Sequence, residues 1–163
     1  MADTNYQFED FFASLGDEYK DFVTTIHELV QQAGFDKITI ASSKVNLFTV
    51  KYTNKKTRRG IVNFTLRRKS FAVTVLANNH DKYPELLNNM PEQMVSQIEK
   101  TQTCMNISEP GKCMDKCVGY EFNIRDKNFQ KCKFGCFKFT VSEDNMPYLL
   151  ELVKNELEAR RAV

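Results

Sequence analysis

The chain has 163 residues, of which 42% are hydrophobic and 27% are charged, and its formal net charge is +2. A chain of this length can bury roughly two thirds of its unfolded surface, so we expect one domain over residues 1–163 that folds without disulfides. The first residues lack the basic and apolar regions of a signal peptide, and no apolar run reaches the length of a membrane span. These features exclude an integral membrane protein and predict a cytoplasmic one.

The charges are segregated along the chain. Residues 1–36 carry a formal charge of −7, residues 37–80 carry +10 without a single Asp or Glu, and residues 81–163 carry −1. A basic block of this kind attracts anionic partners at long range.

Two amphipathic helices are predicted before residue 35. Thr4 and Gln7 match a capping box ahead of the first helix, and Gly16 supplies its end. Asp17 can cap the second helix, which ends at Gly34. The apolar positions of the first helix are Phe8, Phe11, Phe12 and Leu15. Those of the second helix are Phe22, Val23, Ile26, Leu29 and Val30.

β-branched and aromatic residues then predict four antiparallel strands. The expected strands are Ile38–Ala41, Val45–Tyr52, Ile61–Arg67 and Ser70–Ala77. The polar and basic stretch of residues 54–60 is typical of a hairpin loop longer than two residues. Alternation along the last of these strands predicts one core face and one face that is only thinly apolar.

The second half of the chain predicts further helices and strands. Pro84 and Pro91 favour helices over residues 84–89 and 91–101. Alternating residues predict strands near 120–125 and 137–141, and Ser142 or Asp144 can cap a last helix. The apolar face of that helix holds Met146, Leu149, Leu150, Val153 and Leu157.

The element order ααββββααββα predicts an α+β fold with a single antiparallel sheet and helices packed on one face. The other face of the sheet is then polar and open to solvent. The residues expected on that outer face are Asn63, Thr65, Thr74, Asn123, Arg125 and Thr140.

This order, together with the segment VKYTNKKTRRGIVNFTLRRKSFAVTVLA, resembles small uncharacterised bacterial α+β proteins of the YdhG-like type. The resemblance covers residues 16–101 and the last strand and helix. It supports the expected fold, and no functional residue is carried over from it. The cysteine segment over residues 104–136 departs from that group.

One interpretation of the five cysteines is a zinc site. Cys113 and Cys117 form one CxxxC pair, Cys132 and Cys136 form a second, and Cys104 is a further candidate ligand. Tetrahedral zinc needs four thiolates around one point, so both pairs have to lie on bends. Free thiols packed as small hydrophobes, or a thiol-based redox or metal-handling protein, are the alternatives.

No catalytic residue is predicted. The chain lacks a nucleophile elbow, a Walker A loop, a Rossmann fingerprint and an HExxH motif. His27 is expected at the border of a packed helix face, and His80 in a polar turn as a capping or solvent residue. A non-catalytic domain that binds a small molecule or an anionic partner is therefore the expected function.

The basic block supplies the candidate anion-binding residues, with nucleic acid as an alternative partner. These candidates are Lys55, Lys56, Arg58, Arg59, Arg67, Arg68 and Lys69. In the predicted hairpin, the candidates in the loop lie at one end of the ribbon, and those at the far end of its second strand lie at the other. The competing interpretation is a hairpin kept soluble by charge, and the isoelectric point near 8.2 is below the range typical of nucleic-acid modules.

Overall fold

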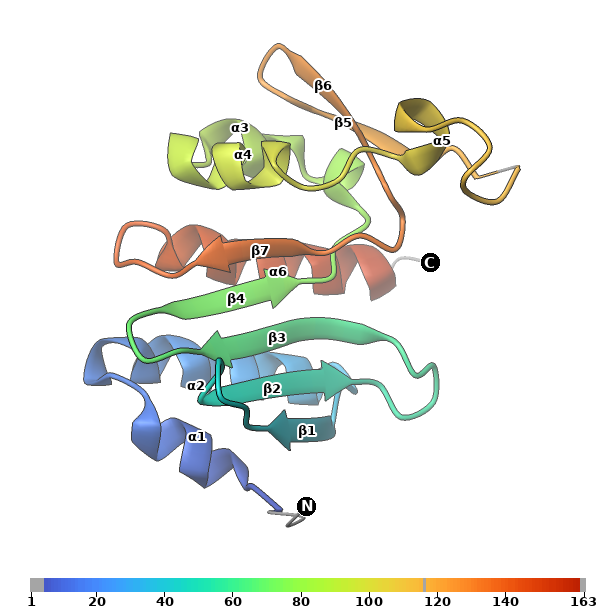
Figure 1. The fold of residues 1–163 in the computed structure, drawn as a ribbon. Coiled ribbons are helices and arrows are strands. Elements are labelled where there is room, and N and C mark those ends of the chain that lie inside the picture. The colour runs from blue at the N-terminus through green and yellow to red at the C-terminus, as the bar shows by residue number, and fades with distance from the viewer. Residues whose placement is uncertain (1–4, 116, 162–163) are drawn as a thin grey trace.

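The computed structural model describes residues 5–115 and 117–161. This part of the chain forms an α+β fold: a five-stranded antiparallel sheet, a separate two-stranded hairpin, and six α-helices (Figure 1). The fold class predicted from the sequence is confirmed. None of the helices in the described ranges combines the length and apolarity that crossing a membrane requires.

The helices and strands have the following bounds. The helices are α1 (Phe8–Ser14), α2 (Asp17–Gln32), α3 (Pro84–Asn89), α4 (Glu92–Glu99), α5 (Met105–Ser108) and α6 (Met146–Arg161), with a 3₁₀ helix at His80–Lys82. The strands are β1 (Lys37–Ala41), β2 (Phe48–Thr53), β3 (Gly60–Leu66), β4 (Phe71–Val75), β5 (Tyr120–Ile124), β6 (Lys127–Lys131) and β7 (Phe137–Thr140).

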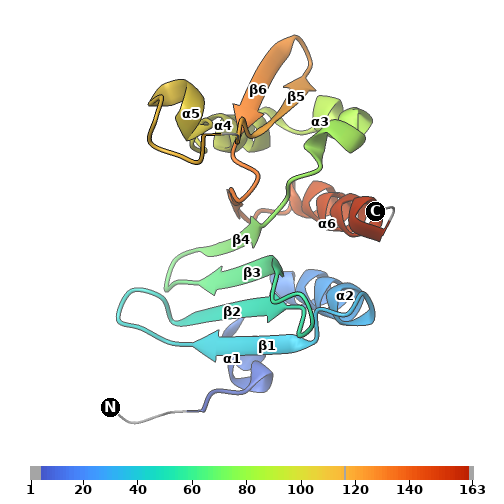
Figure 2. The same ribbon diagram turned by 90° about the vertical axis from the view of Figure 1, so that its right-hand side faces the viewer.

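The main sheet has the strand order β1-β2-β3-β4-β7. Its first four strands are a meander, and β7 then returns from late in the chain to pair with β4, with Phe139 opposite Val73. Residues 76–136 are inserted between these two neighbouring strands. They carry α3, α4, α5 and the β5–β6 hairpin, which lie beyond the β7 side of the sheet (Figures 1 and 2).

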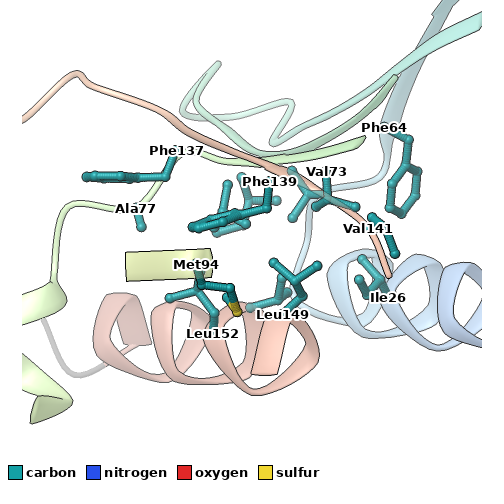
Figure 3. Close-up of a cluster of buried hydrophobic side chains, with 14 of the residues drawn as sticks. Ile26, Phe64, Val73, Ala77, Met94, Phe137, Phe139, Val141, Leu149 and Leu152 are labelled. Atoms are coloured by element: carbon teal, nitrogen blue, oxygen red, sulfur yellow. The ribbon is translucent and has the colours of Figure 1, made fainter. Parts of the chain in front are cut away.

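Helices α2 and α6 cover one face of the sheet, behind it in Figure 1 and to its right in Figure 2. The inward strand residues, such as Phe64, Val73 and Phe139, are fully buried against these helices. Figure 3 shows them facing Ile26 of α2 and Leu149 of α6. The predicted one-sided packing follows from this period-two alternation, because every second side chain of a strand points to the helix-covered face. In β4 the residues between them are buried as well.

The start of each N-terminal helix differs from the prediction. Thr4 lies outside the described residues, and the capping box of α1 pairs Gln7 with Asp10, whose carboxylate accepts the Gln7 backbone N–H at 2.8 Å. Gly16 is the N-cap of α2, and Asp17 is its first helical residue. Both helices therefore begin close to the expected positions, with different capping residues.

The β5–β6 hairpin is the main departure from the predicted order, because β6 was not predicted. Arg125 occupies its tight turn at a φ of 55°. Its backbone N–H donates to the Asn88 side chain at 2.6 Å, and its guanidinium contacts Glu92 at 2.5 Å and donates to the Met90 carbonyl at 3.0 Å. These contacts hold a backbone conformation that non-glycine residues seldom adopt. The predicted place of Asn123 and Arg125 on the outer face of the main sheet is therefore wrong.

Candidate functional site

A cleft of about 650 Å³ opens where the C-terminal ends of α2 and α6 meet the β2–β3 and β6–β7 loops. Its walls combine apolar, amide and cationic side chains. The apolar ones are Ala33, Phe35, Leu76, Phe134 and Leu157, the amides are Asn54, Asn78 and Asn79, and the cations are Arg59, Lys133, Arg160 and Arg161. No Asp or Glu is among the described residues that line the cleft.

Asn54 orders the loop that carries Arg59 to the cleft. The Asn54 side-chain oxygen accepts the backbone N–H groups of Lys56 and Thr57, each at 2.9 Å. The Asn54 backbone N–H donates to the Arg59 carbonyl at 2.9 Å, and the Arg58 N–H donates to the Asn54 carbonyl at 2.8 Å. An Asn that accepts N–H groups two and three residues ahead stabilises a turn by itself. The loop therefore has a defined conformation that places Arg59 beside the cleft.

Glu156, on the inner face of α6, is a buried hydrogen-bond acceptor behind the cleft wall. It is 0% exposed and accepts hydrogen bonds from the Tyr83 hydroxyl at 3.0 Å, Asn79 Nδ2 at 2.9 Å and Arg160 Nε at 3.1 Å. The Asn78 backbone N–H also donates to it, at 3.2 Å. Burial and the Glu156 carboxylate raise the pKa of Tyr83 well above its usual value of 10.0. Tyr83 therefore remains a neutral hydrogen-bond donor.

Arg160 is held rigidly in the wall of the cleft. Besides Glu156, it donates to the carbonyl of Gly60 at 3.1 Å and to that of Leu76, and its guanidinium lies over the Phe35 ring at 5.7 Å from the centroid. Arg160 and Arg161 also offset the partial negative charge at the C-terminus of α6. Since Glu156 neutralises one cation, the positive charges of Arg59, Lys133 and Arg161 remain at the cleft.

The residues predicted to bind anions do not form one cluster. Lys55, Lys56, Arg58 and Arg59 lie in the β2–β3 loop, while Arg67, Arg68 and Lys69 lie in the β3–β4 turn. The seven residues of β3 separate the two groups by about 20 Å. Of the seven candidates, Arg59 is the one among the residues that line the cleft. Anion binding by the set stays a prediction.

The cysteines lie on bends, as the zinc prediction required, but they do not cluster. The Gly135 N–H donates to the Cys132 carbonyl at 3.0 Å, and the Cys117 N–H to the Met114 carbonyl at 3.0 Å. Cys104 is 3% exposed and begins α5. Within residues 5–115 and 117–161, no three His, Cys, Asp or Glu side chains lie close enough together to hold a metal ion. A zinc site made by Cys113, Cys117, Cys132 and Cys136 stays a prediction without geometric support.

The loop between β6 and β7 separates two hollows. Phe134 and Gly135 line the cationic cleft on one side, and on the other side they line a shallower hollow of about 640 Å³. Cys132, Cys136 and Lys138 also line this second hollow.

The two histidines differ in burial. His27 is half-buried, stacks on Phe8 with 4.1 Å between ring centroids, and has its Nδ1 2.7 Å from the Tyr52 hydroxyl. The predicted border position of His27 is confirmed. His80 is 0% exposed, so its predicted role as a solvent or capping residue is wrong.

The His80 ring joins the β5–β6 hairpin to the main sheet. It lies 4.7 Å from Phe122 and 4.4 Å from Phe137, measured between ring centroids. His80 Nδ1 lies 2.8 Å from the Tyr120 hydroxyl, which itself donates to the Ala77 carbonyl at 3.3 Å. His80 Nε2 has no hydrogen-bond partner among the described residues. Burial lowers the pKa of His80 to about 3, so the ring is neutral near pH 7.

Comparison with known proteins gives no assignment. No family model, curated protein or solved structure matches the chain. The resemblance to YdhG-like proteins therefore stays a prediction, and a functional proposal has to depend on geometry and charge.

Sequence reasoning missed Glu156, Arg160 and Tyr83. One signal was available, because Leu149, Leu152, Val153 and Glu156 follow the i, i+3, i+4, i+7 spacing of one helix face. A carboxylate at a core position of such a face indicates a buried polar network, since an unpaired buried charge is too costly to keep.

Proposed function

We propose that this chain is a non-catalytic binding domain whose cleft takes a small ligand with an anionic group and an apolar body. The observation that carries the proposal is the composition of the cleft. Arg59, Lys133 and Arg161 supply positive charge, and the described lining residues include no carboxylate to oppose it.

The size and walls of the cleft support a ligand of this kind. A volume of about 650 Å³ is within the range of sites for small molecules, which are mostly apolar with a few polar groups that fix orientation. Phe35 and Leu157 offer the apolar surface. Arginine donates two parallel hydrogen bonds to a carboxylate or a phosphate, which makes Arg59 and Arg161 suitable partners for the anionic group.

The same walls favour binding over catalysis. General acid–base chemistry near pH 7 depends on a His, a carboxylate or another group with a matched pKa. Among the described residues of the cleft, the titratable side chains are those of Lys133 and three arginines. Arginine keeps its proton in proteins, so the three arginines bind anions and do not transfer protons.

A fluorescence titration with 1-anilinonaphthalene-8-sulfonate tests the proposal, because this probe joins an aromatic body to a sulfonate. We expect saturable binding of one probe per chain, displaced by phosphorylated or carboxylated aromatic compounds. Arg59→Ala and Arg161→Ala should each weaken binding about threefold to tenfold, as expected for loss of a partly exposed charge-assisted hydrogen bond.

The matched control is Arg68→Ala, which removes the same charge at the opposite end of β3. It should leave the affinity within about twofold. Equal weakening by all three substitutions would show that net charge, and not the cleft, binds the probe. Binding unaffected by Arg59→Ala and Arg161→Ala would refute the proposed site.

A further inference from the structure

The face of the main sheet that points away from α2 and α6 is open. It faces the viewer in Figure 1, where no helix of the described chain crosses it. Strand pairing and alternation place on this face Lys37, Thr39, Ala41, Thr49, Lys51, Asn63, Thr65, Ala72, Thr74, Lys138 and Thr140. Apart from the lysines these side chains are small, and Thr65, Ala72 and Thr74 are less than 10% exposed, so the surface is flat.

The charge of this face has one sign. The charged residues of the five strands are Lys37, Lys51 and Lys138, and the strands contain no Asp or Glu. Apart from Arg59, which lines the cleft, the β2–β3 loop adds three cations at one end of the face, and the β3–β4 turn adds three at the other. Eight of the ten bases of residues 37–80 therefore lie across and around one surface.

These cations are largely free to meet an external anion. Of the ten bases in residues 37–80, Lys55 is the one that forms an ion pair within the described ranges, with Asp36 at 3.2 Å. Helix α2, which carries four of the acidic residues of the first 36, packs on the covered side of the sheet (Figure 2). The near-neutral total charge is the sum of chain segments of opposite sign, so it gives no argument against a polyanion on the open face.

The dimensions of the face fit a nucleic-acid duplex. Five strands about 4.8 Å apart and a β3 about 20 Å long make a platform roughly 20 Å on each side. Lysine, arginine, threonine and asparagine side chains donate hydrogen bonds to phosphate oxygens, and such contacts carry no sequence information. The outward strand residues include no aromatic side chain for stacking single-stranded bases, which favours a duplex backbone over a single strand.

We propose that this open face binds the phosphate backbone of double-stranded nucleic acid, DNA or RNA, without sequence preference. The two basic ends of the hairpin contact phosphates on either side, and Lys51 and Lys138 lie between them. The proposal is independent of the cleft, because neither Lys51 nor Lys138 lines it.

Fluorescence anisotropy with labelled random-sequence 24-base-pair DNA and RNA duplexes, and with the corresponding single strands, tests this proposal. We expect duplex affinity to fall between 50 and 200 mM salt with a log–log slope of about −4 to −6, as for five or six neutralised phosphates. The double variant K51E/K138E should bind at least about tenfold more weakly at 100 mM salt.

The control variant K82E/K154E changes the net charge by the same amount, at exposed lysines outside the face. It should stay within about twofold of the unaltered chain, and circular dichroism verifies folding of both variants. If K51E/K138E does not fold, K51Q/K138Q should reduce the salt slope by about two. No duplex binding at 50 mM salt, equal loss in both double variants, or binding of polyglutamate but not of duplexes would each overturn the proposal.

Discussion

Acidification should destabilise this protein through His80. In the folded chain burial lowers the pKa of His80 from 6.5 to about 3, whereas in the unfolded chain the ring titrates near 6.5. As the pH falls below 6.5, the unfolded state takes up a proton that the folded state refuses. The contribution of His80 to the free energy of unfolding is therefore fully present above pH 6.5 and is lost progressively as the pH falls toward 3.

The size of the loss follows from the shift. Each pH unit between the two pKa values removes about 1.4 kcal/mol, which gives about 3 kcal/mol at pH 4 and about 4 kcal/mol at pH 3, where the folded ring is half protonated. Such a loss is a large fraction of the roughly 5–15 kcal/mol that stabilises a typical domain.

His80→Phe isolates this effect. A phenyl ring keeps the stacking on Phe122 and Phe137, and Tyr120 can still donate to the Ala77 carbonyl. The variant should be about 1 kcal/mol less stable near pH 8, where a hydrogen bond is lost, and more stable than the unaltered chain below about pH 6. Urea unfolding followed by circular dichroism between pH 4 and 8 measures both curves.

His27→Gln is the control, because the ring of His27 is half-buried and should contribute a smaller slope. Parallel pH curves for His80→Phe and the unaltered chain would refute the reasoning. They would mean that the ring becomes charged inside the fold or that the hairpin separates from the sheet before global unfolding.

Three further predictions concern buried or strained positions. Glu156→Ala should cost about 3–5 kcal/mol in urea unfolding, because Arg160 and the other donors lose a buried acceptor. Gly119→Ala should cost more than about 2 kcal/mol in the same assay, since an added Cβ would lie 2.3 Å from the Lys131 carbonyl oxygen at a φ of +68°. In thiol labelling of the native protein, exposed Cys136 should react first and buried Cys104 last.

Each of these has its own control. Glu151→Ala removes an exposed carboxylate whose partner is Lys154 three residues along α6, so it should change stability by less than about 0.5 kcal/mol. Gly111→Ala has positive φ but open space around its Cβ, so it should cost less than Gly119→Ala. Four thiols that stay protected until a chelator is added would contradict the labelling order and would support the zinc prediction.

Periodicity predicted the elements whose burial is regular. The stripes of α2 and α6 and the alternation in β2 and β7 survive in the structure because each of these elements buries one face. Strand β6 was missed for the opposite reason. In KNFQK the inward residues are Phe129 and Lys131, and a lysine that is 3% exposed gives no apolar signal. Its ammonium group is satisfied by the Glu99 and Thr101 carbonyls, which are distant in the sequence.

The candidate site was only partly predictable. The basic loop with Arg59 is evident in the sequence, but Lys133, Arg160 and Arg161 join it through packing between distant segments. The burial of His80 likewise depends on where the β5–β6 hairpin lies, and its polar neighbours suggested the reverse. The spacing of the cysteines shows which two of them can lie close together on one turn of the chain. It carries no information on whether two such turns pack against each other.

The late return of β7 to the side of β4 also bears on how the chain is synthesised. The meander β1 to β4 needs contacts between segments adjacent in sequence, whereas β7 must cross the whole of residues 76–136 before it pairs. Until residue 140 has emerged from the ribosome, β4 is an unprotected edge, and the apolar surface that α6 later covers is exposed. If the ribosome stalls while it translates residues 76–136, the incomplete sheet keeps this exposed edge. Such sheets on neighbouring ribosomes of one polysome would then be prone to pair with each other.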